Sequence, residues 1–215
     1  MENQHLQNPK IINSNLWKHV MFHPTAAFNY IFANKRQMSL LYLFLFGGAV
    51  SGIERLLDKN TVGDPFDYGH LTISILAGAA LGWISYYILA LILSFAGNYL
   101  KGKASDRDFR IVIAWALIPT IFSLFVLIPQ FIIYGAGSND LTFSTYLSPR
   151  SLFLISLKVI SAILGIWSFV ILVKGVAYIQ NFSIKRAILN IIAPILIIVG
   201  IILLFLAIIG VANII

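Results

Sequence analysis

Charged residues at two places in this otherwise apolar sequence could bind an ionic group. The first is GNYLKGKASDRDFR at 97–110, which holds Lys101, Lys103, Arg107 and Arg110. Clustered cations of this kind bind phosphate or carboxylate groups. The second is Lys158, the only charge well inside an apolar run. A charge in apolar surroundings needs a partner, and it marks either an ion pair or a polar cavity.

The composition requires membrane-spanning helices to position these residues. The chain has 215 residues, of which 59% are hydrophobic and 11% charged, whereas a soluble domain carries about 25% charged residues. Lipid must therefore be the solvent, and one integral-membrane domain is expected. The first residues lack the pattern of a cleavable signal, so we expect the first span to remain as an anchor.

Uncharged runs predict an all-α bundle of five transmembrane helices, because a bilayer core needs about 20 apolar residues per helix. The predicted spans lie near 37–56, 71–96, 109–134, 151–174 and 187–211, and together they make up a transmembrane domain over 37–215. Residues 1–36 form a cytoplasmic segment. Within that segment, Pro24 begins a predicted short amphipathic helix in the membrane interface, with an irregular lead-in as the alternative.

Basic residues alternate between the two sides of the predicted bundle. Most of them fall in the N-terminal segment, the second loop and the fourth loop, whereas the first and third loops hold only Arg55, Lys59 and Arg150. This pattern predicts a cytoplasmic N-terminus and a C-terminus outside. The net charge of +7 is therefore attributed to the basic loops that set the membrane topology, and no nucleic-acid partner is expected.

The basic loops give the first candidate site. Its members would face the cytoplasm: Lys101, Lys103, Arg107, Arg110, Lys185 and Arg186. Ser105 is predicted to cap the helix that follows, with Asp108 at the third helical position. The charges are explained either as an ordinary cytoplasmic rim or as a surface for anionic lipid headgroups or an acidic protein.

The second candidate site is an intramembrane polar group made of Glu54, Gln130 and Lys158. Glu54 ends the first span on the same predicted outer side as Lys158, so the sequence predicts an ion pair that joins spans one and four. A polar cavity that opens outward is the alternative.

Prolines and small residues predict where helices bend and pack. Pro119 leaves the carbonyl of Trp115 without its helical donor, and Pro194 does the same to Asn190, so a kink is expected at each. Small residues four apart predict close helix packing, within the bundle or in a homodimer. These pairs are Gly48 and Gly52, Gly78 and Gly82, and Ser161 and Gly165.

No catalytic motif is present, so the chain is predicted not to be an enzyme, and neither a cofactor nor a metal is expected. The absence of cysteine excludes disulfides and thiol catalysis. Asp64, Asp67 and His70 are interpreted as part of a polar turn, because their spacing matches no zinc or calcium site.

The ordered set HPTAAF, GNYLKGKAS and AWALIP resembles the Ypt-interacting protein (Yip) domain family of five-span membrane proteins. Ala114, Trp115 and Pro119 stand where eukaryotic relatives have a GY-x-L-L-P-like element, and the span-four stretch through Lys185 and Arg186 is also similar. The resemblance implies a five-helix bundle with a cytoplasmic N-terminus. In eukaryotes it implies Golgi or endoplasmic-reticulum trafficking with Rab/Ypt GTPases. The short segment before the first span is more similar to a prokaryotic member in the inner membrane.

Two functional hypotheses follow. The first is a non-enzymatic membrane scaffold or adaptor in membrane organisation or trafficking, whose basic cytoplasmic face holds a protein or anionic lipid. The alternative is a transporter or channel for a small solute, ion or lipid, in the form of a dimer. A polar cavity near Lys158 would favour the alternative.

Overall fold

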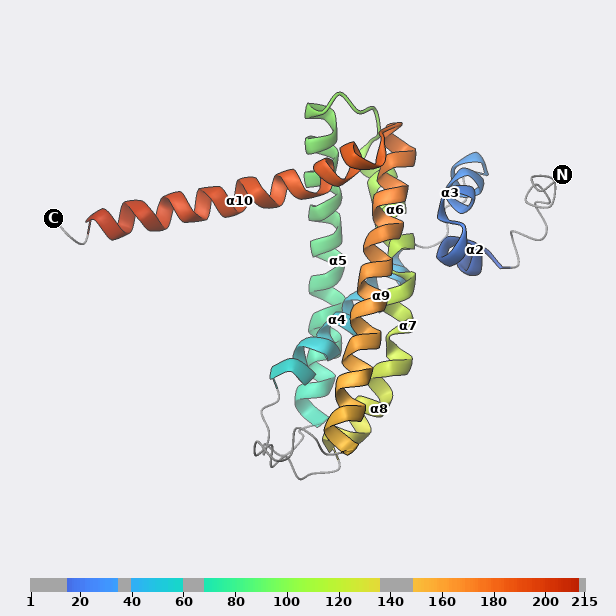
Figure 1. Cartoon of the computed structure of the whole chain (residues 1–215), viewed down its shortest axis with the longest axis vertical. Coiled ribbons are helices and arrows are strands. Elements are labelled where there is room, and N and C mark those ends of the chain that lie inside the picture. Colours follow the sequence, from blue (N-terminus) through green and yellow to red (C-terminus); the bar gives the residue numbers. More distant parts are fainter. Residues whose placement is uncertain (1–14, 35–39, 60–67, 136–148, 213–215) are drawn as a thin grey trace.

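The described part of the computed structural model, residues 15–34, 40–59, 68–135 and 149–212, is entirely helical (Figure 1). Its helices are α2 (Leu16–Phe22), α3 (Pro24–Ala33), α4 (Leu40–Lys59), α5 (Tyr68–Tyr99), α6 (Asp106–Ala116), α7 (Ile118–Phe122), α8 (Leu124–Gly135), α9 (Pro149–Gln180) and α10 (Ile184–Ala212). Four of the predicted spans fall on continuous helix where they are described, and the span at 109–134 is interrupted at Leu117 and Ser123. Residues 37–39 of the first span lie outside the described part.

Four stretches of the described chain are long and apolar enough to cross a membrane: Leu40–Asp58, Tyr68–Tyr99, Asp106–Gln130 and Ser151–Gln180. The chain is therefore a multi-pass integral membrane protein. α10 is a further helix of 29 residues, and its side chains are described only in part. In Figure 1 it crosses the bundle near one end and then runs away from α5 and α9. The count of five spans stays a prediction.

The closest helix contact joins α4 and α5 through their glycines. Gly48 and Gly52 on α4 face Gly78 and Gly82 on α5, backbone against backbone. A Cβ atom built at Gly78 would lie 2.6 Å from the carbonyl oxygen of Gly48 and 2.7 Å from the Cα of Gly52. The predicted packing role of these four residues is confirmed. At Gly165, in contrast, a Cβ would meet nothing within 4 Å, so this residue makes no close helix contact.

The third predicted span is divided into α6, α7 and α8. The first division falls at Leu117, two residues before Pro119, which lies in the first turn of α7. The predicted interruption near Pro119 is thus present. The hydroxyl of Ser168 on α9 donates a hydrogen bond to the Ala116 carbonyl at this division. A neighbouring helix therefore supplies the donor that lipid cannot.

The other two residues of the predicted kinks, Trp115 and Pro194, lie in different parts of the bundle. Trp115 is 4% exposed within the apolar cluster of the bundle. Pro194 lies inside the continuous helix α10, and the side chain of Asn190 one turn earlier is fully buried. Neither proline lines the cavity described below.

The predicted helix at Pro24 is present as α3, but its apolar face contacts protein. Phe28 is fully buried and lies close to Gly175 on α9, and the Tyr178 hydroxyl lies 3.3 Å from the Asn29 side-chain oxygen. The preceding helix α2 is tied to α9 by a hydrogen bond of 2.9 Å from the Trp167 indole nitrogen to the Met21 carbonyl. The position of this helix pair relative to the membrane interface stays a prediction.

The α4–α5 contact gives the first testable prediction. Gly78→Ala places a methyl group against two backbones that have no room to move, so we expect a loss of about 1–3 kcal/mol in stability. Thermal unfolding of the purified protein in mild detergent measures the change. Gly165→Ala is the matched control, because it makes the same substitution in helix α9 where the space is open. Equal unfolding temperatures for the two variants would contradict the close packing.

Candidate functional site

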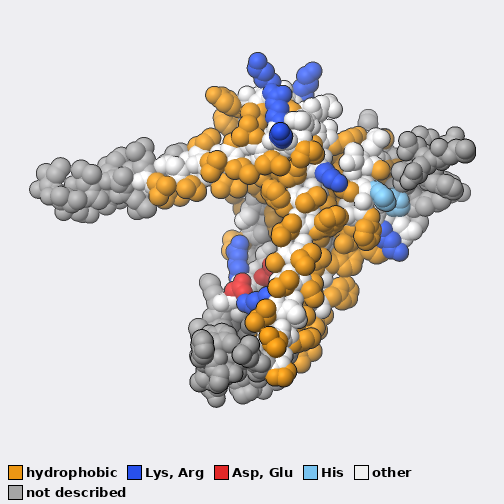
Figure 2. All heavy atoms as spheres, in the orientation of Figure 1, with side chains coloured by type: hydrophobic (Ala, Val, Ile, Leu, Met, Phe, Trp, Pro, Cys, Tyr) orange, Lys and Arg blue, Asp and Glu red, His pale blue; other side chains and the backbone are white. Residues whose placement is uncertain are grey.

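One end of the bundle, where α5 meets α6 and α9 meets α10, carries most of the described cations; we call it the basic end. Figure 2 shows Lys and Arg side chains projecting there from a surface that is otherwise mostly hydrophobic. Four of the predicted residues are exposed and form no ion pair with a described residue. These are Lys101, Lys103, Arg107 and Lys185. They are free to bind an anionic group.

The other two predicted members of the basic surface serve the fold. Arg110 forms a 2.7 Å ion pair with Asp106, and its guanidinium lies 5.0 Å from the centre of the Tyr87 ring. Arg186 donates a 2.7 Å hydrogen bond to the Leu100 carbonyl and lies over Phe182. Both cations are therefore occupied, and they hold the loop between α5 and α6 in place.

The loop that presents Lys101 and Lys103 is fixed by a buried glutamine that the sequence analysis did not single out. Gln180 is 4% exposed, and its side-chain oxygen accepts a 3.1 Å hydrogen bond from the Ala104 backbone. Its amide packs against Gly97 and Gly102, where any larger residue would collide with it. A polar residue at the end of a long apolar run is the signal that could have indicated this role.

Helix ends also shape this loop. The predicted capping box is confirmed, because Ser105 and Asp108 exchange side-chain hydrogen bonds with each other's backbone. Lys101 follows the end of α5 with φ 64, and Asn181 follows α9 with φ 53. This left-handed conformation favours glycine, is tolerated by asparagine, and costs most other residues about 1–2 kcal/mol. The position of the Lys101 charge is thus held at a cost to stability.

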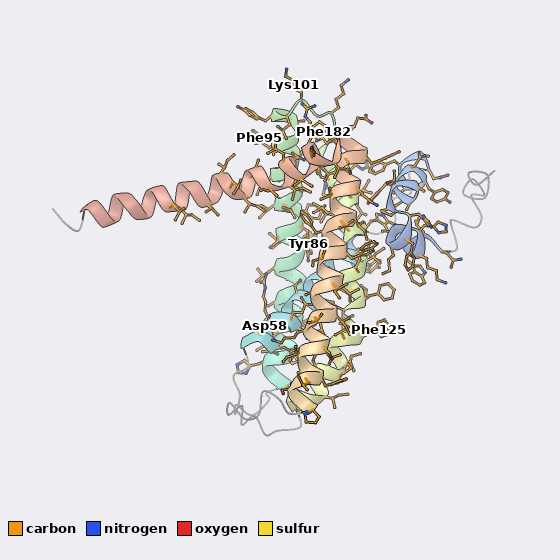
Figure 3. The ribbon with its side chains drawn as sticks, in the orientation of Figure 1. Asp58, Tyr86, Phe95, Lys101, Phe125 and Phe182 are labelled. Atoms are coloured by element: carbon orange, nitrogen blue, oxygen red, sulfur yellow. The ribbon has the colours of Figure 1, made fainter. Side chains whose placement is uncertain are left out.

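A cavity of about 290 Å³ lies at the opposite end of the bundle, which we call the cavity end. It is lined by Glu54, Leu57 and Asp58 of α4, Leu127 and Gln130 of α8, and Lys158, Ser161 and Ala162 of α9. The three predicted residues of the intramembrane polar site are thus brought together around one space. Figure 3 labels Asp58 at this end and Lys101 at the other.

The predicted ion pair between Glu54 and Lys158 is wrong, because Lys158 pairs with a different carboxylate. The Lys158 ammonium lies 3.1 Å from Asp58, one turn further along α4, and both side chains are more than half exposed. Its flexible stem reaches outward to the more accessible carboxylate. Glu54 instead lies 3.1 Å from the hydroxyl of Ser123. The link between spans one and four is therefore present, but it runs through Asp58.

No group of three His, Asp or Glu side chains that could hold a metal occurs among the described residues. Of the polar turn considered above, Asp64 and Asp67 lie outside them. The polar chemistry that the described chain offers is therefore cation-mediated binding at the basic end and mixed-charge binding at the cavity end.

The role of Gln180 leads to a second prediction. Gln180→Leu keeps much of the side-chain volume but removes the acceptor for Ala104, so we expect the loop to open and trypsin to cleave after Lys101 or Lys103 at least several times faster. Limited proteolysis followed by mass spectrometry of the fragments measures the rate. Tyr99→Phe, an exposed change beside the same loop, should leave it unaltered. Wild-type cleavage rates in Gln180→Leu would show that the glutamine does not hold the loop.

Comparison with known proteins places these features in a family. No curated protein and no solved structure matches the chain. The Yip1 domain matches residues 18–207, a range that includes both the basic end and the cavity end. The chain belongs to the Yip1 domain family of membrane proteins.

Proposed function

We propose that this chain is a non-enzymatic membrane scaffold whose basic end binds anionic groups on the cytoplasmic side of the membrane. The observation that carries the proposal is a set of four exposed cations at the basic end that pair with no described acid: Lys101, Lys103, Arg107 and Lys185. Local acids do not neutralise them, since Asp106 pairs with Arg110 and Asp108 serves the helix cap. Family membership supports a role without catalysis.

The backbone at Lys101 adds support. A lysine in the left-handed conformation sacrifices stability that glycine would restore. A residue that is unfavourable for folding but places a charge on the basic end is typical of a position kept for binding.

The orientation of the basic end toward the cytoplasm follows from the distribution of charge over the loops. The anionic group belongs either to headgroups of the surrounding lipid or to an acidic segment of a protein partner. A prokaryotic inner membrane is the proposed location, on the resemblance described above.

Replacing the four cations with glutamine tests the scaffold function. Each basic residue near an anionic surface contributes about 1 kcal/mol, so the quadruple variant should bind up to about a thousandfold more weakly. Native mass spectrometry counts retained phosphatidylglycerol against phosphatidylcholine. Fluorescence anisotropy of a labelled hexaglutamate peptide, with the protein in phosphatidylcholine nanodiscs, tests whether the anionic group belongs to an acidic protein segment. If neither probe binds more weakly to the variant, the proposal fails.

A single substitution separates binding from stability. Lys101→Gly should raise thermal stability while weakening the binding of anionic probes, because it removes both the backbone strain and one charge. Asn181→Gly is the matched control, since it relieves the same conformation at the end of α9 without changing charge. It should raise stability less than Lys101→Gly, because asparagine tolerates this conformation, and it should leave binding unaltered. A rise in stability with wild-type binding for both variants would indicate that the Lys101 charge has no part in binding.

One observation favours the second candidate function, a small-solute, ion or lipid transporter or channel acting as a dimer. The cavity at Lys158 is the polar space that such a function needs. Toward the basic end, however, a cluster of buried apolar residues fills the described bundle, with Phe44, Phe109 and Trp115 among its members. This arrangement supports binding at one end better than passage, so we favour the scaffold.

A further inference from the structure

The cavity end is a built site that the scaffold function does not use. Three helices contribute polar side chains to it: Glu54 from α4, Gln130 from α8, and Lys158 and Ser161 from α9. Glu54 lies five residues before the end of α4 at Lys59, or about 7 Å by helical rise. The polar headgroup layer on each side of the hydrocarbon core is about 5–8 Å thick. A helix α4 that ends at the outer edge of this layer would place the cavity near the boundary where headgroups meet acyl chains.

Among the residues that line the cavity, two carboxylates, Glu54 and Asp58, stand against one cation, Lys158. Lys158 is paired with Asp58 at the rim, where both side chains are more than half exposed. Glu54 lies deeper and has the Ser123 hydroxyl as its described hydrogen-bond partner. An ionised carboxylate accepts several hydrogen bonds and is costly in apolar surroundings without a cation. The interior of the cavity thus favours a positively charged donor.

Two further polar groups point to a ligand. Gln130 is 3% exposed, and its side-chain amide can both donate and accept. The hydroxyl oxygen of Ser161 is buried and has no hydrogen-bond partner among the described residues. A buried polar atom left unpaired costs about 1–3 kcal/mol. A ligand with N–H groups in the cavity would pair with Ser161 and with Glu54.

The exposed surface beside the cavity suits an acyl chain. Helical periodicity puts Ala162, Gly165 and Phe169 on one stripe of α9 that runs from the cavity toward the centre of the membrane. Each is exposed, and nothing lies within 4 Å of the position where Gly165 would carry a side chain. An open apolar strip that leads from a polar cavity matches the shape of a lipid, with its headgroup inside and its chain along the helix.

We propose that the cavity binds the primary ammonium of an aminophospholipid headgroup, such as phosphatidylethanolamine. Glu54 accepts hydrogen bonds from the ammonium, and Gln130 and Ser161 complete its shell. Lys158 at the rim faces the phosphate, and an acyl chain lies along the strip of α9. A quaternary ammonium has no N–H to donate, so phosphatidylcholine should bind more weakly.

The test uses the full chain purified in mild detergent with an equimolar mixture of phosphatidylethanolamine, phosphatidylcholine and phosphatidylglycerol. Native mass spectrometry counts each retained lipid. We expect phosphatidylethanolamine to be retained about tenfold over phosphatidylcholine. Glu54→Gln should reduce that preference about tenfold, and Ser161→Leu, which fills the cavity, should abolish it. Thermal unfolding verifies that each variant is folded, and Ser161→Ala gives a milder change if the leucine variant is not.

Arg55→Gln is the matched control, because Arg55 is exposed beside Glu54 and does not line the cavity. This variant should keep the preference for phosphatidylethanolamine.

Soluble O-phosphoethanolamine distinguishes a lipid headgroup from a small soluble amine as the source of the ammonium. If it stabilises the protein against heat at millimolar concentration while the two zwitterionic lipids are retained equally, the ligand is a small soluble amine and the lipid proposal is wrong. Equal retention without such stabilisation, or wild-type preference in Glu54→Gln, would also overturn it. Retention of phosphatidylglycerol, which reports on the basic end, should not change with Glu54.

Discussion

The rest of the bundle depends on the backbone contact between α4 and α5. Lipid tails are as apolar as the side chains of a transmembrane helix, so helices in a membrane gain little from burying apolar surface against each other. Close packing must supply the attraction instead. Gly48, Gly52, Gly78 and Gly82 allow it, because each lacks the side chain that would hold the two backbones apart. This contact fixes the direction of α4 and so sets the position of Glu54 and Asp58 at its far end.

The polar groups of the described chain are concentrated at two ends, and the material between them is apolar. At the basic end, arginines and a glutamine bind backbone carbonyls, aromatic rings and amides, so that a short loop is presented as a rigid surface. At the cavity end, charges meet across three helices. The broken span α6–α7–α8 connects the two, and the Ser168 hydroxyl donates a hydrogen bond to the Ala116 carbonyl at its first break. Within the described bundle, the carbonyl at this break is paired by a side chain of a neighbouring helix, and the charged groups lie toward the two ends.

Helix positions could be predicted from the sequence because the cost of charge in hydrocarbon acts on every residue locally. The interruption at Pro119 and the Ser105 cap are also local chemistry, and both are present. The partner of Lys158 was not predictable, since Glu54 and Asp58 lie one turn apart on the same helix face. The Arg110 and Arg186 contacts with rings and carbonyls depend on which helices are neighbours, and residue spacing in the sequence does not determine that. Gly165 illustrates the same limit, because its spacing matches that of the packed glycines while its surroundings are open.

α10 leaves the bundle near Pro194, so its two parts differ in how tightly their side chains are packed. Before Pro194 its residues Ala187, Asn190 and Ile191 are buried against the other helices, whereas Ile195, Leu196 and Ile197 just after it are exposed. An exposed side chain of this helix has no described neighbour whose shape it must fit. At Ile195, Leu196 and Ile197, interchange among Ile, Leu and Val should therefore be nearly free. The total apolar length is the property this part of the helix has to preserve.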